Sequence, residues 1–283
     1  MSSLRLYCLP YAGSSASVYV RWKRRLPAWI EVVPVELPGR GRRLGEPLET
    51  TVTGVLDRIE RDVRPVPGQA FAVFGHSLGA ILAFELGHRL ESSGFAPAVV
   101  FVSGTRAPGC RDLERYASAQ SDAELRAELE RLGGTPASVL ADPELMELAL
   151  PVLRADFRVA GSYGASSRTD GSAMTSSRVG EPQRKLRAPL VALGGASDET
   201  TRDMLAAWRD HTESEFAMHV LPGGHFFIHT SESELLMLVE QRLRLAGGAR
   251  HSAAGALGPQ LVSTRRQSPP LLGRENDGSL GRG

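Results

Sequence analysis

The stretch Phe71-Ala72-Val73-Phe74-Gly75-His76-Ser77-Leu78-Gly79 decides the fold, because a short apolar run leads through a glycine-flanked serine into a helical pattern. Apolar residues at positions 78, 81, 82, 86 and 90 share one helix face, so a helix is expected over Leu78–Leu90, with Gly94 shortly beyond its end. This G-x-S-x-G motif in a strand-turn-helix setting is typical of a nucleophilic serine held on a sharp turn at the carboxyl end of a sheet. The alternative is a glycine-rich turn with a capping serine.

Short apolar runs on both sides of this motif alternate with longer helical patterns, which favours an α/β fold with a mostly parallel sheet flanked by helices. A last helix is predicted over Glu232–Leu245, with Ser231 and Glu234 as a capping box and Gly247-Gly248 as its stop. The predicted strands are Leu4–Leu9, Glu31–Leu37, Phe71–Phe74, Ala98–Val102, Leu190–Leu193 and Phe216–Val220.

The alternation is interrupted after the fourth predicted strand by a long stretch of helical patterns. Ser121 with Glu124 forms a capping box, and Asp142-Pro143 is an N-cap followed by proline at the first helical position. We therefore predict one domain over residues 1–246, with a helical insertion over about 106–188 placed above the sheet. Residues 161–180 are rich in serine, threonine and glycine and are expected to form a mobile loop.

The composition excludes several classes of protein. The chain has 283 residues, 42% hydrophobic and 23% charged, as expected of a folded globular protein. Its net charge of +1 argues against nucleic-acid binding by bulk charge. Residues 247–283 hold five basic and two acidic residues, which predicts a flexible basic tail. The longest charge-free run, residues 65–84, is interrupted by proline and glycine, so no membrane helix is predicted.

The cysteine spacing and the N-terminal residues bear on location. The two cysteines, Cys8 and Cys110, match neither a disulfide framework nor zinc-ligand spacing. The first apolar stretch contains Arg5 and no signal-peptide pattern, so a cytoplasmic location is expected.

A nucleophilic serine needs a base, and His225 is the best candidate. It follows a predicted strand in Pro222-Gly223-Gly224-His225, which places its imidazole at the same sheet edge as Ser77. His229 lies four residues later, but Phe226 stands where a metalloprotease helix would carry glutamate, so no metal site is predicted. His76, inside the turn, is interpreted as structural.

The remaining parts of a serine hydrolase site are an orienting carboxylate and two N–H donors for an oxyanion. Asp198 fits the carboxylate because it follows the strand Leu190–Leu193 and a predicted Gly194-Gly195 turn; Glu199 and Asp203 are rivals. The donors are expected to be the backbone N–H groups of Leu78 and of Ala12, in the loop after the first strand.

Five motifs occurring in this order resemble the discrete type II thioesterases that accompany polyketide synthases and nonribosomal peptide synthetases, over residues from about 4 to 245. The motifs are Pro10-Tyr11-Ala12-Gly13, Leu37-Pro38-Gly39-Arg40-Gly41-Arg42, Gly75-His76-Ser77-Leu78-Gly79, Leu153-Arg154-Ala155-Asp156-Phe157 and Pro222-Gly223-Gly224-His225-Phe226-Phe227.

The resemblance implies an α/β-hydrolase with a helical lid, in which Ser77, Asp198 and His225 form a catalytic triad and Ala12 and Leu78 form the oxyanion hole. It also implies an acyl or peptidyl carrier protein as partner and hydrolysis of acyl groups from that protein's phosphopantetheine arm, with no cofactor in this chain. The chain departs from the family pattern at Ser14-Ser15, in the long polar stretch 164–184 and in the basic tail.

The sequence leaves the role of two basic clusters open. The cluster over residues 21–25 either meets an acidic carrier protein or forms a solvated helix face, and the cluster over residues 40–43 either meets that protein or forms local structural pairs. The same triad would serve a serine esterase or acyltransferase acting on small esters or acyl-CoA. A third possible function is that of a non-catalytic protein that binds a carrier protein.

Asp156 is interpreted as shaping the base of the lid, against the competing idea that it is catalytic.

Overall fold

The computed structural model describes residues 3–111, 121–163 and 184–256. Its six strands form one sheet in the order β2-β1-β3-β4-β5-β6, and every neighbouring pair is parallel. This confirms the predicted α/β class. The strands are β1 (Leu4–Leu9), β2 (Ile30–Pro34), β3 (Phe71–His76), β4 (Val100–Ser103), β5 (Leu190–Gly195) and β6 (Phe216–Leu221).

Helices connect these parallel strands, as crossover connections require. The α-helices are α1 (Trp22–Arg25), α2 (Val52–Ile59), α3 (Leu78–Ser92), α5 (Asp122–Leu132), α6 (Ala137–Leu140), α7 (Pro143–Ser162), α8 (Arg202–Ala206), α9 (Phe227–Thr230) and α10 (Glu232–Ala256). Short 3-10 turns are η1 (Ala16–Tyr19), η2 (Gly41–Arg43), η3 (Pro108–Cys110) and η5 (Ala207–His211).

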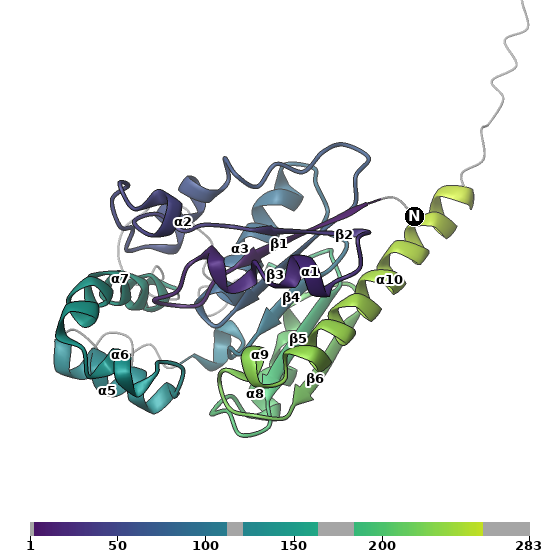
Figure 1. Cartoon of the computed structure of the whole chain (residues 1–283). Helices are drawn as coiled ribbons and strands as arrows, with labels where there is room; N and C mark the ends of the chain where they lie inside the picture. The colour runs from purple at the N-terminus through teal and green to yellow at the C-terminus, as the bar shows by residue number, and fades with distance from the viewer. Residues whose placement is uncertain (1–2, 112–120, 164–183, 257–283) are drawn as a thin grey trace, which may run out of the picture.

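Both faces of the sheet are buried, because successive side chains of a strand point to opposite faces. In β1, Leu6 and Cys8 join a core that includes side chains of α1 and α10. Tyr7 and Leu9 of the same strand join a second core with side chains of α2 and α3. Figure 1 shows α10 running along one face of the sheet. Because all neighbouring strands are parallel, their carboxyl ends lie at one edge of this layer.

The predicted turn at Gly194-Gly195 is wrong. Both glycines belong to β5, where they pair with Val220 and Leu221 of β6. A Cβ on Gly195 would lie 2.3 Å from the carbonyl oxygen of Gly224. Glycine is therefore required here by a close approach of two backbones rather than by a turn. The other strand predictions differ from the structure only at their ends.

The predicted helix stop at Gly247-Gly248 is also wrong, since α10 continues to Ala256. A glycine inside a helix costs only about 1 kcal/mol relative to alanine. Alanines at positions 246 and 249 flank the pair, and alanine is the strongest helix former. The part of the predicted tail after residue 256 lies outside the described residues.

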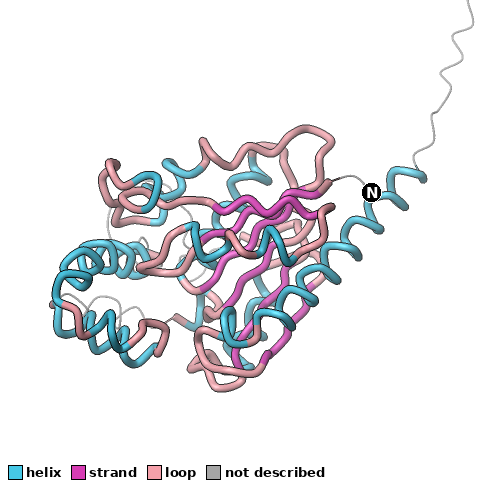
Figure 2. The backbone as a smooth tube through the Cα atoms, viewed as in Figure 1, coloured by secondary structure: helices cyan, strands magenta, loops and turns pink. Residues whose placement is uncertain are grey.

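The described residues between β4 and β5 form η3, α5, α6 and α7, together with an isolated bridge from Leu186 to Thr212. Both helix starts predicted in this segment are confirmed. Ser121 and Glu124 form a complete capping box, and the Asp142 side chain accepts from two backbone N–H groups of α7. The capping box predicted at Ser231 differs from the structure, where the Ser231 hydroxyl donates to the carbonyl of Pro222 at 2.7 Å. Figure 2 shows α5 to α7 gathered at one end of the sheet. Most of the predicted mobile loop lies outside the described residues.

No helix in residues 3–111, 121–163 and 184–256 is long and apolar enough to cross a membrane.

Candidate active site

Ser77 lies between β3 and α3 with φ 55° and ψ −113°. Among the described residues it is the only non-glycine with a positive φ. Its own N–H donates to the carbonyl of Ser103 at 2.7 Å. A Cβ on Gly75 would lie 1.8 Å from the carbonyl oxygen of Gly79, and one on Gly79 would lie 2.2 Å from that of Leu9. Glycine is therefore required at both positions for the chain to turn so sharply from strand to helix.

Three side chains from different loops meet above this turn. The Nε2 atom of His225 lies 3.1 Å from Ser77 Oγ, and its Nδ1 atom lies 3.1 Å from Asp198 Oδ2. The side chains of His225 and Asp198 are 13% and 4% exposed, so the hydrogen-bonded chain is shielded from bulk water. The structure thus brings together Ser77, His225 and Asp198, as expected from the sequence.

Backbone hydrogen bonds hold the loops of Asp198 and His225 against each other. Ala196 N–H donates to Leu221 O at 2.8 Å, and Ser197 N–H donates to Gly223 O at 2.9 Å. The Asp198 carboxylate also accepts from the N–H of Thr200 at 3.4 Å. The two backbone bonds continue the β5–β6 ladder beyond the strand ends and hold the loop of Asp198 against that of His225.

The two rival acids have other places. Asp203 lies in the first turn of α8, and Glu199 forms an ion pair with Arg131 of α5. The hydrogen bond from Nδ1 of His225 goes to Asp198. Asp198 is accordingly the carboxylate in hydrogen-bond contact with the imidazole.

His76 and His229 are structural neighbours of the site. His76 is fully buried, and its Nδ1 lies 2.9 Å from Ser103 Oγ. Burial lowers the pKa of His76 well below its usual value, helped by the nearby His225 and His229. A neutral ring therefore packs beside His225, with their centroids 5.3 Å apart. His229 Nε2 lies 2.9 Å from the hydroxyl of Tyr11.

Ala12 and Leu78 line one pocket together with Ser77. Leu78 is the first residue of α3, and the first N–H groups of a helix have no partner within the helix. Ala12 follows β1 in the loop at the same sheet edge. The pocket is open to solvent, and its empty space is about 730 Å³ when the solvent at its mouth is included. Both predicted oxyanion residues thus lie beside the serine.

The wall of the pocket was not predicted. Its apolar part includes Ile81 of α3, Leu132 of α5 and Phe157 and Ala160 of α7. Its polar part includes Thr105, Arg106, Arg111 and Glu128. The repeat of apolar residues at positions 153, 157 and 160 marks one face of α7 and was the available signal. Which surface that face covers depends on the tertiary fold.

Asp156 of α7 is paired with Arg40 rather than with a histidine. Its Oδ2 and Oδ1 atoms lie 2.5 and 2.7 Å from Nη1 and Nη2 of Arg40. This agrees with a structural role at the base of the helical segment. Among the described residues there is no group of three histidine, cysteine, aspartate or glutamate side chains arranged to hold a metal ion.

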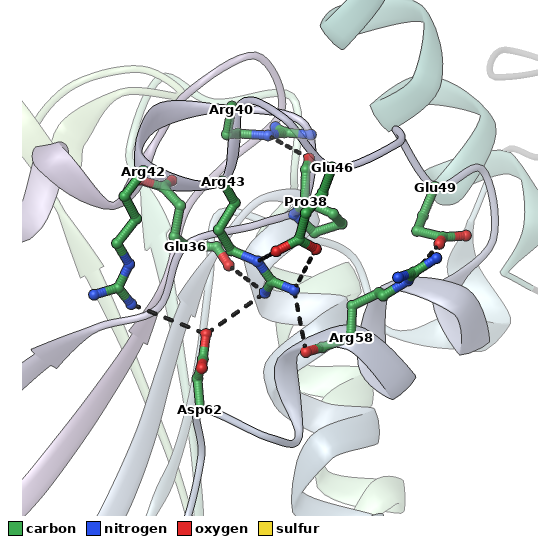
Figure 3. Close-up of polar contacts among 9 residues, drawn as sticks. All are labelled: Glu36, Pro38, Arg40, Arg42, Arg43, Glu46, Glu49, Arg58 and Asp62. Atoms are coloured by element: carbon green, nitrogen blue, oxygen red, sulfur yellow. Dashed lines mark hydrogen bonds and ion pairs between the residues drawn. The ribbon is translucent and has the colours of Figure 1, made fainter.

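Most arginines of the two basic clusters form ion pairs within the fold. Arg21 and Arg25 both pair with the buried Glu232 at the start of α10. Arg43 donates to the carbonyls of Glu36 and Arg58. Figure 3 shows that its guanidinium also faces Glu46 and Asp62, and that the exposed Arg42 points toward Asp62.

Comparisons with known proteins agree with this geometry. A sequence model of the family "Thioesterase domain" matches residues 4–243. The gramicidin S biosynthesis protein GrsT of Aneurinibacillus migulanus is 37% identical over 246 residues, covering 86% of this chain and 90% of that protein.

Two solved structures share the α/β-hydrolase fold. ClbQ from the colibactin nonribosomal peptide and polyketide pathway is 31% identical, with a TM-score of 0.76, over 88% of this chain and 100% of ClbQ. The type II thioesterase BorB from the borrelidin cluster is 33% identical, with a TM-score of 0.69, over 85% and 93%. The chain therefore belongs to the thioesterase family, among relatives that include type II thioesterases of nonribosomal peptide and polyketide pathways.

Proposed function

We propose that this chain is an editing thioesterase that hydrolyses stalled or aberrant acyl groups from the phosphopantetheine arm of acyl or peptidyl carrier proteins. The observation that carries the proposal is the hydrogen-bonded chain from Ser77 Oγ through the His225 ring to Asp198 Oδ2, with 3.1 Å at each step. Its relatives in nonribosomal peptide and polyketide pathways support the choice of carrier-bound substrates.

The first half-reaction forms an acyl-enzyme. Ser77 Oγ attacks the thioester carbonyl carbon while His225 Nε2 takes the hydroxyl proton. Asp198 accepts the Nδ1–H bond, which fixes the tautomer and stabilises the imidazolium. The N–H groups of Ala12 and Leu78 stabilise the oxyanion of the tetrahedral intermediate. The C–S bond then breaks, and the leaving sulfur of the arm receives the proton from His225.

The second half-reaction releases the product. A water molecule loses a proton to His225 Nε2 and attacks the carbonyl carbon of the acyl-Ser77 ester. Collapse of the second tetrahedral intermediate breaks the bond to Ser77 Oγ, which regains the proton from His225. The products are a carboxylic acid and the free enzyme. In this cycle the chain's own side chains supply every proton transfer, and the phosphopantetheine arm belongs to the substrate.

The pocket wall and the cysteines support two further parts of the proposal. Ile81, Leu132 and Phe157 offer an apolar surface beside Ser77 for the acyl chain. Cys8 and Cys110 are both free thiols, which accords with a reducing cytoplasm as the site of action. Burial also raises the pKa of the Cys8 thiol well above its usual value, so this sulfur is inert toward thioesters.

The test is acyl release from a panel of acyl-loaded carrier proteins, followed by intact mass. We expect the wild type to remove acyl groups and a folded Ser77→Ala variant to remove none. Ser93→Ala, at the exposed end of α3, is the matched control and should retain full activity. Near-normal release by Ser77→Ala would overturn the proposal.

Two comparisons separate the other candidate functions. Faster turnover of the matching oxygen ester than of the thioester would indicate an esterase. If a fluorophosphonate failed to label Ser77 and no substrate turned over, a non-catalytic binding role would follow. Labelling that is lost in His225→Ala supports the proposed cycle.

A further inference from the structure

We propose that Asp156 is a positioning residue that sets the oxyanion loop, defined here as residues 10–14, through the buried pair that it forms with Arg40. This inference rests on the proposed function, since it assigns a role in stabilising the oxyanion formed at Ser77. Asp156 forms no hydrogen bond with Ser77 or His225 among the described residues. It acts through the backbone of the loop that contains Ala12.

The loop is held from two sides by one ion pair. Gly13, the residue after Ala12, donates its N–H to Asp156 Oδ2 at 2.8 Å. The guanidinium of Arg40 binds both oxygens of Asp156 and also donates from Nη1 to the carbonyl of Ser14 at 3.3 Å. A single carboxylate and its partner therefore fix the N–H of one loop residue and the carbonyl of the next.

Burial makes this arrangement stiff. The side chains of Arg40 and Asp156 are 8% and 2% exposed, so water and salt screen the pair weakly. The two parallel N–H bonds to one carboxylate also define the relative orientation of both groups. Loss of one partner would leave the other charge buried, which is strongly unfavourable.

Arg40 is itself held on a well-anchored loop. Its Nε donates to Pro38 O at 3.4 Å, and Gly39 N–H donates to Arg43 O at 3.1 Å. Figure 3 shows Arg43 joining this loop to the backbone of Glu36 and to Arg58 of α2. The carboxylate of Glu36 accepts from Ala16 N–H at 2.9 Å, which ties the same loop to the residues after the oxyanion loop.

Helix α7 packs against the oxyanion loop. Gly13 has φ +75°, and a Cβ there would lie 2.6 Å from Leu153 Cδ2. Leu153 and Asp156 are three residues apart on one helix face, so one contacts Gly13 by packing and the other by hydrogen bonding. The position of the Ala12 N–H is consequently set by α7, which also supplies Phe157 and Ala160 to the pocket wall.

An oxyanion donor works only when it lies 2.7–3.1 Å from the developing charge, and loss of one donor costs about 10²–10³ in rate. A loosened loop should therefore lower kcat and leave substrate binding nearly unchanged. A role confined to fold stability predicts a lower melting temperature with normal kcat.

The experiment compares Asp156→Asn with Glu91→Gln. Glu91 is also buried, at 5% exposure, and accepts from the N–H groups of Arg187 and Ala188 at 3.0 and 2.7 Å, outside the Ser77 pocket. We expect Asp156→Asn to lower kcat by about 10- to 100-fold with less than about 3-fold change in KM. Glu91→Gln should lower the melting temperature and leave kcat within about 2-fold of the wild type.

A second readout isolates the oxyanion. A trifluoromethyl ketone that forms a tetrahedral adduct with Ser77 should bind Asp156→Asn more weakly by the factor lost in kcat/KM. A non-hydrolysable thioether analogue of the substrate should bind as tightly as to the wild type. Arg40→Gln should reproduce this pattern, and adding it to Asp156→Asn should cost little more, because both remove the same pair.

Unchanged kcat in folded Asp156→Asn would overturn the inference, as would equal weakening of both analogues. Both results differ from failure of the proposed function, which would appear as turnover by Ser77→Ala with Asp156 intact.

Discussion

Arg131 of α5 forms an ion pair with Glu199, the residue that follows Asp198. Just beyond α5, Gly134 lies against Phe226, because a Cβ on this glycine would fall 2.0 Å from the ring of Phe226. Phe226 in turn follows His225. The end of α5 therefore contacts both loops that carry His225 and Asp198, and Leu132 and Glu199 of these segments line the pocket.

Replacing Arg131 with glutamine should loosen this contact and speed entry of bulky reagents. Arg131 and Glu199 are 35% and 49% exposed, so the pair contributes no more than about 1 kcal/mol. We expect the second-order rate of Ser77 labelling by a bulky fluorophosphonate to rise up to about 5-fold. Arg244→Gln, which breaks an exposed pair on α10, is the control. Identical labelling rates for the two variants would contradict the prediction.

Asp198→Asn should lower kcat by about 10⁴, because an asparagine would stabilise the wrong tautomer of His225. Asp203→Asn, five residues later in α8, removes a carboxylate in the first turn of that helix and should leave kcat unchanged. Steady-state hydrolysis of an acyl thioester by both variants checks this. A loss in Asp203→Asn of similar size would show that the wrong acid has been assigned.

Gly75→Ala should destabilise the protein by about 3 kcal/mol or more, since its Cβ would overlap the backbone of Gly79 at 1.8 Å. Gly45→Ala is the matched control: no heavy atom lies within 4 Å of its Cβ position. Urea unfolding of both variants measures the difference. A Gly75→Ala protein as stable as Gly45→Ala would mean that the turn relaxes more readily than its geometry indicates.

Stability should fall as the pH drops from about 6.5 toward 4. Burial lowers the pKa of both His88 and His211 to about 4, against the usual 6.5, and Arg184 adds to the effect at His88. Above pH 6.5 both rings are neutral in the folded and unfolded chain, so their contribution is fully present. Between the two values the unfolded chain binds more protons, and stability is lost.

His88→Leu tests this assignment through the pH dependence of unfolding. Removing one titrating ring should reduce the slope of unfolding free energy against pH by up to about 1.4 kcal/mol per pH unit in this range. Urea unfolding at several pH values between 4 and 7 gives the slope. An unchanged slope would show that other groups dominate acid unfolding.

The parts of the molecule that were predictable are those with a local signature. The turn at Ser77 needs glycine at fixed offsets, and the capping box at Ser121 needs glutamate three residues on, so both are visible in the sequence. The meeting of Ser77, Asp198 and His225 was predictable because parallel strands bring their carboxyl ends to one edge, which restricts where the loops that follow them can lie.

The parts that were not predictable depend on partners distant in the chain. Gly194 and Gly195 resemble a turn until β6 pairs with them. Arg40 and Asp156 are 116 residues apart, and no local sequence pattern predicts that they form an ion pair. Arg21 and Arg25 resemble a docking surface because their shared partner, Glu232, lies more than 200 residues later. Arginines that the sequence suggests are free surface charges are therefore partners in ion pairs of the folded chain.

The positive φ of Ser77 has a consequence for how this fold can change over time. A non-glycine residue in such a conformation is strained by of order 1–3 kcal/mol, whereas glycine adopts it without that strain. Ser77→Gly should therefore yield an inactive protein that is more stable than the wild type, and its melting temperature would show it. Stability and reactivity are opposed at this one position. In a lineage released from selection for hydrolysis, Ser77→Gly would therefore be a stabilising change.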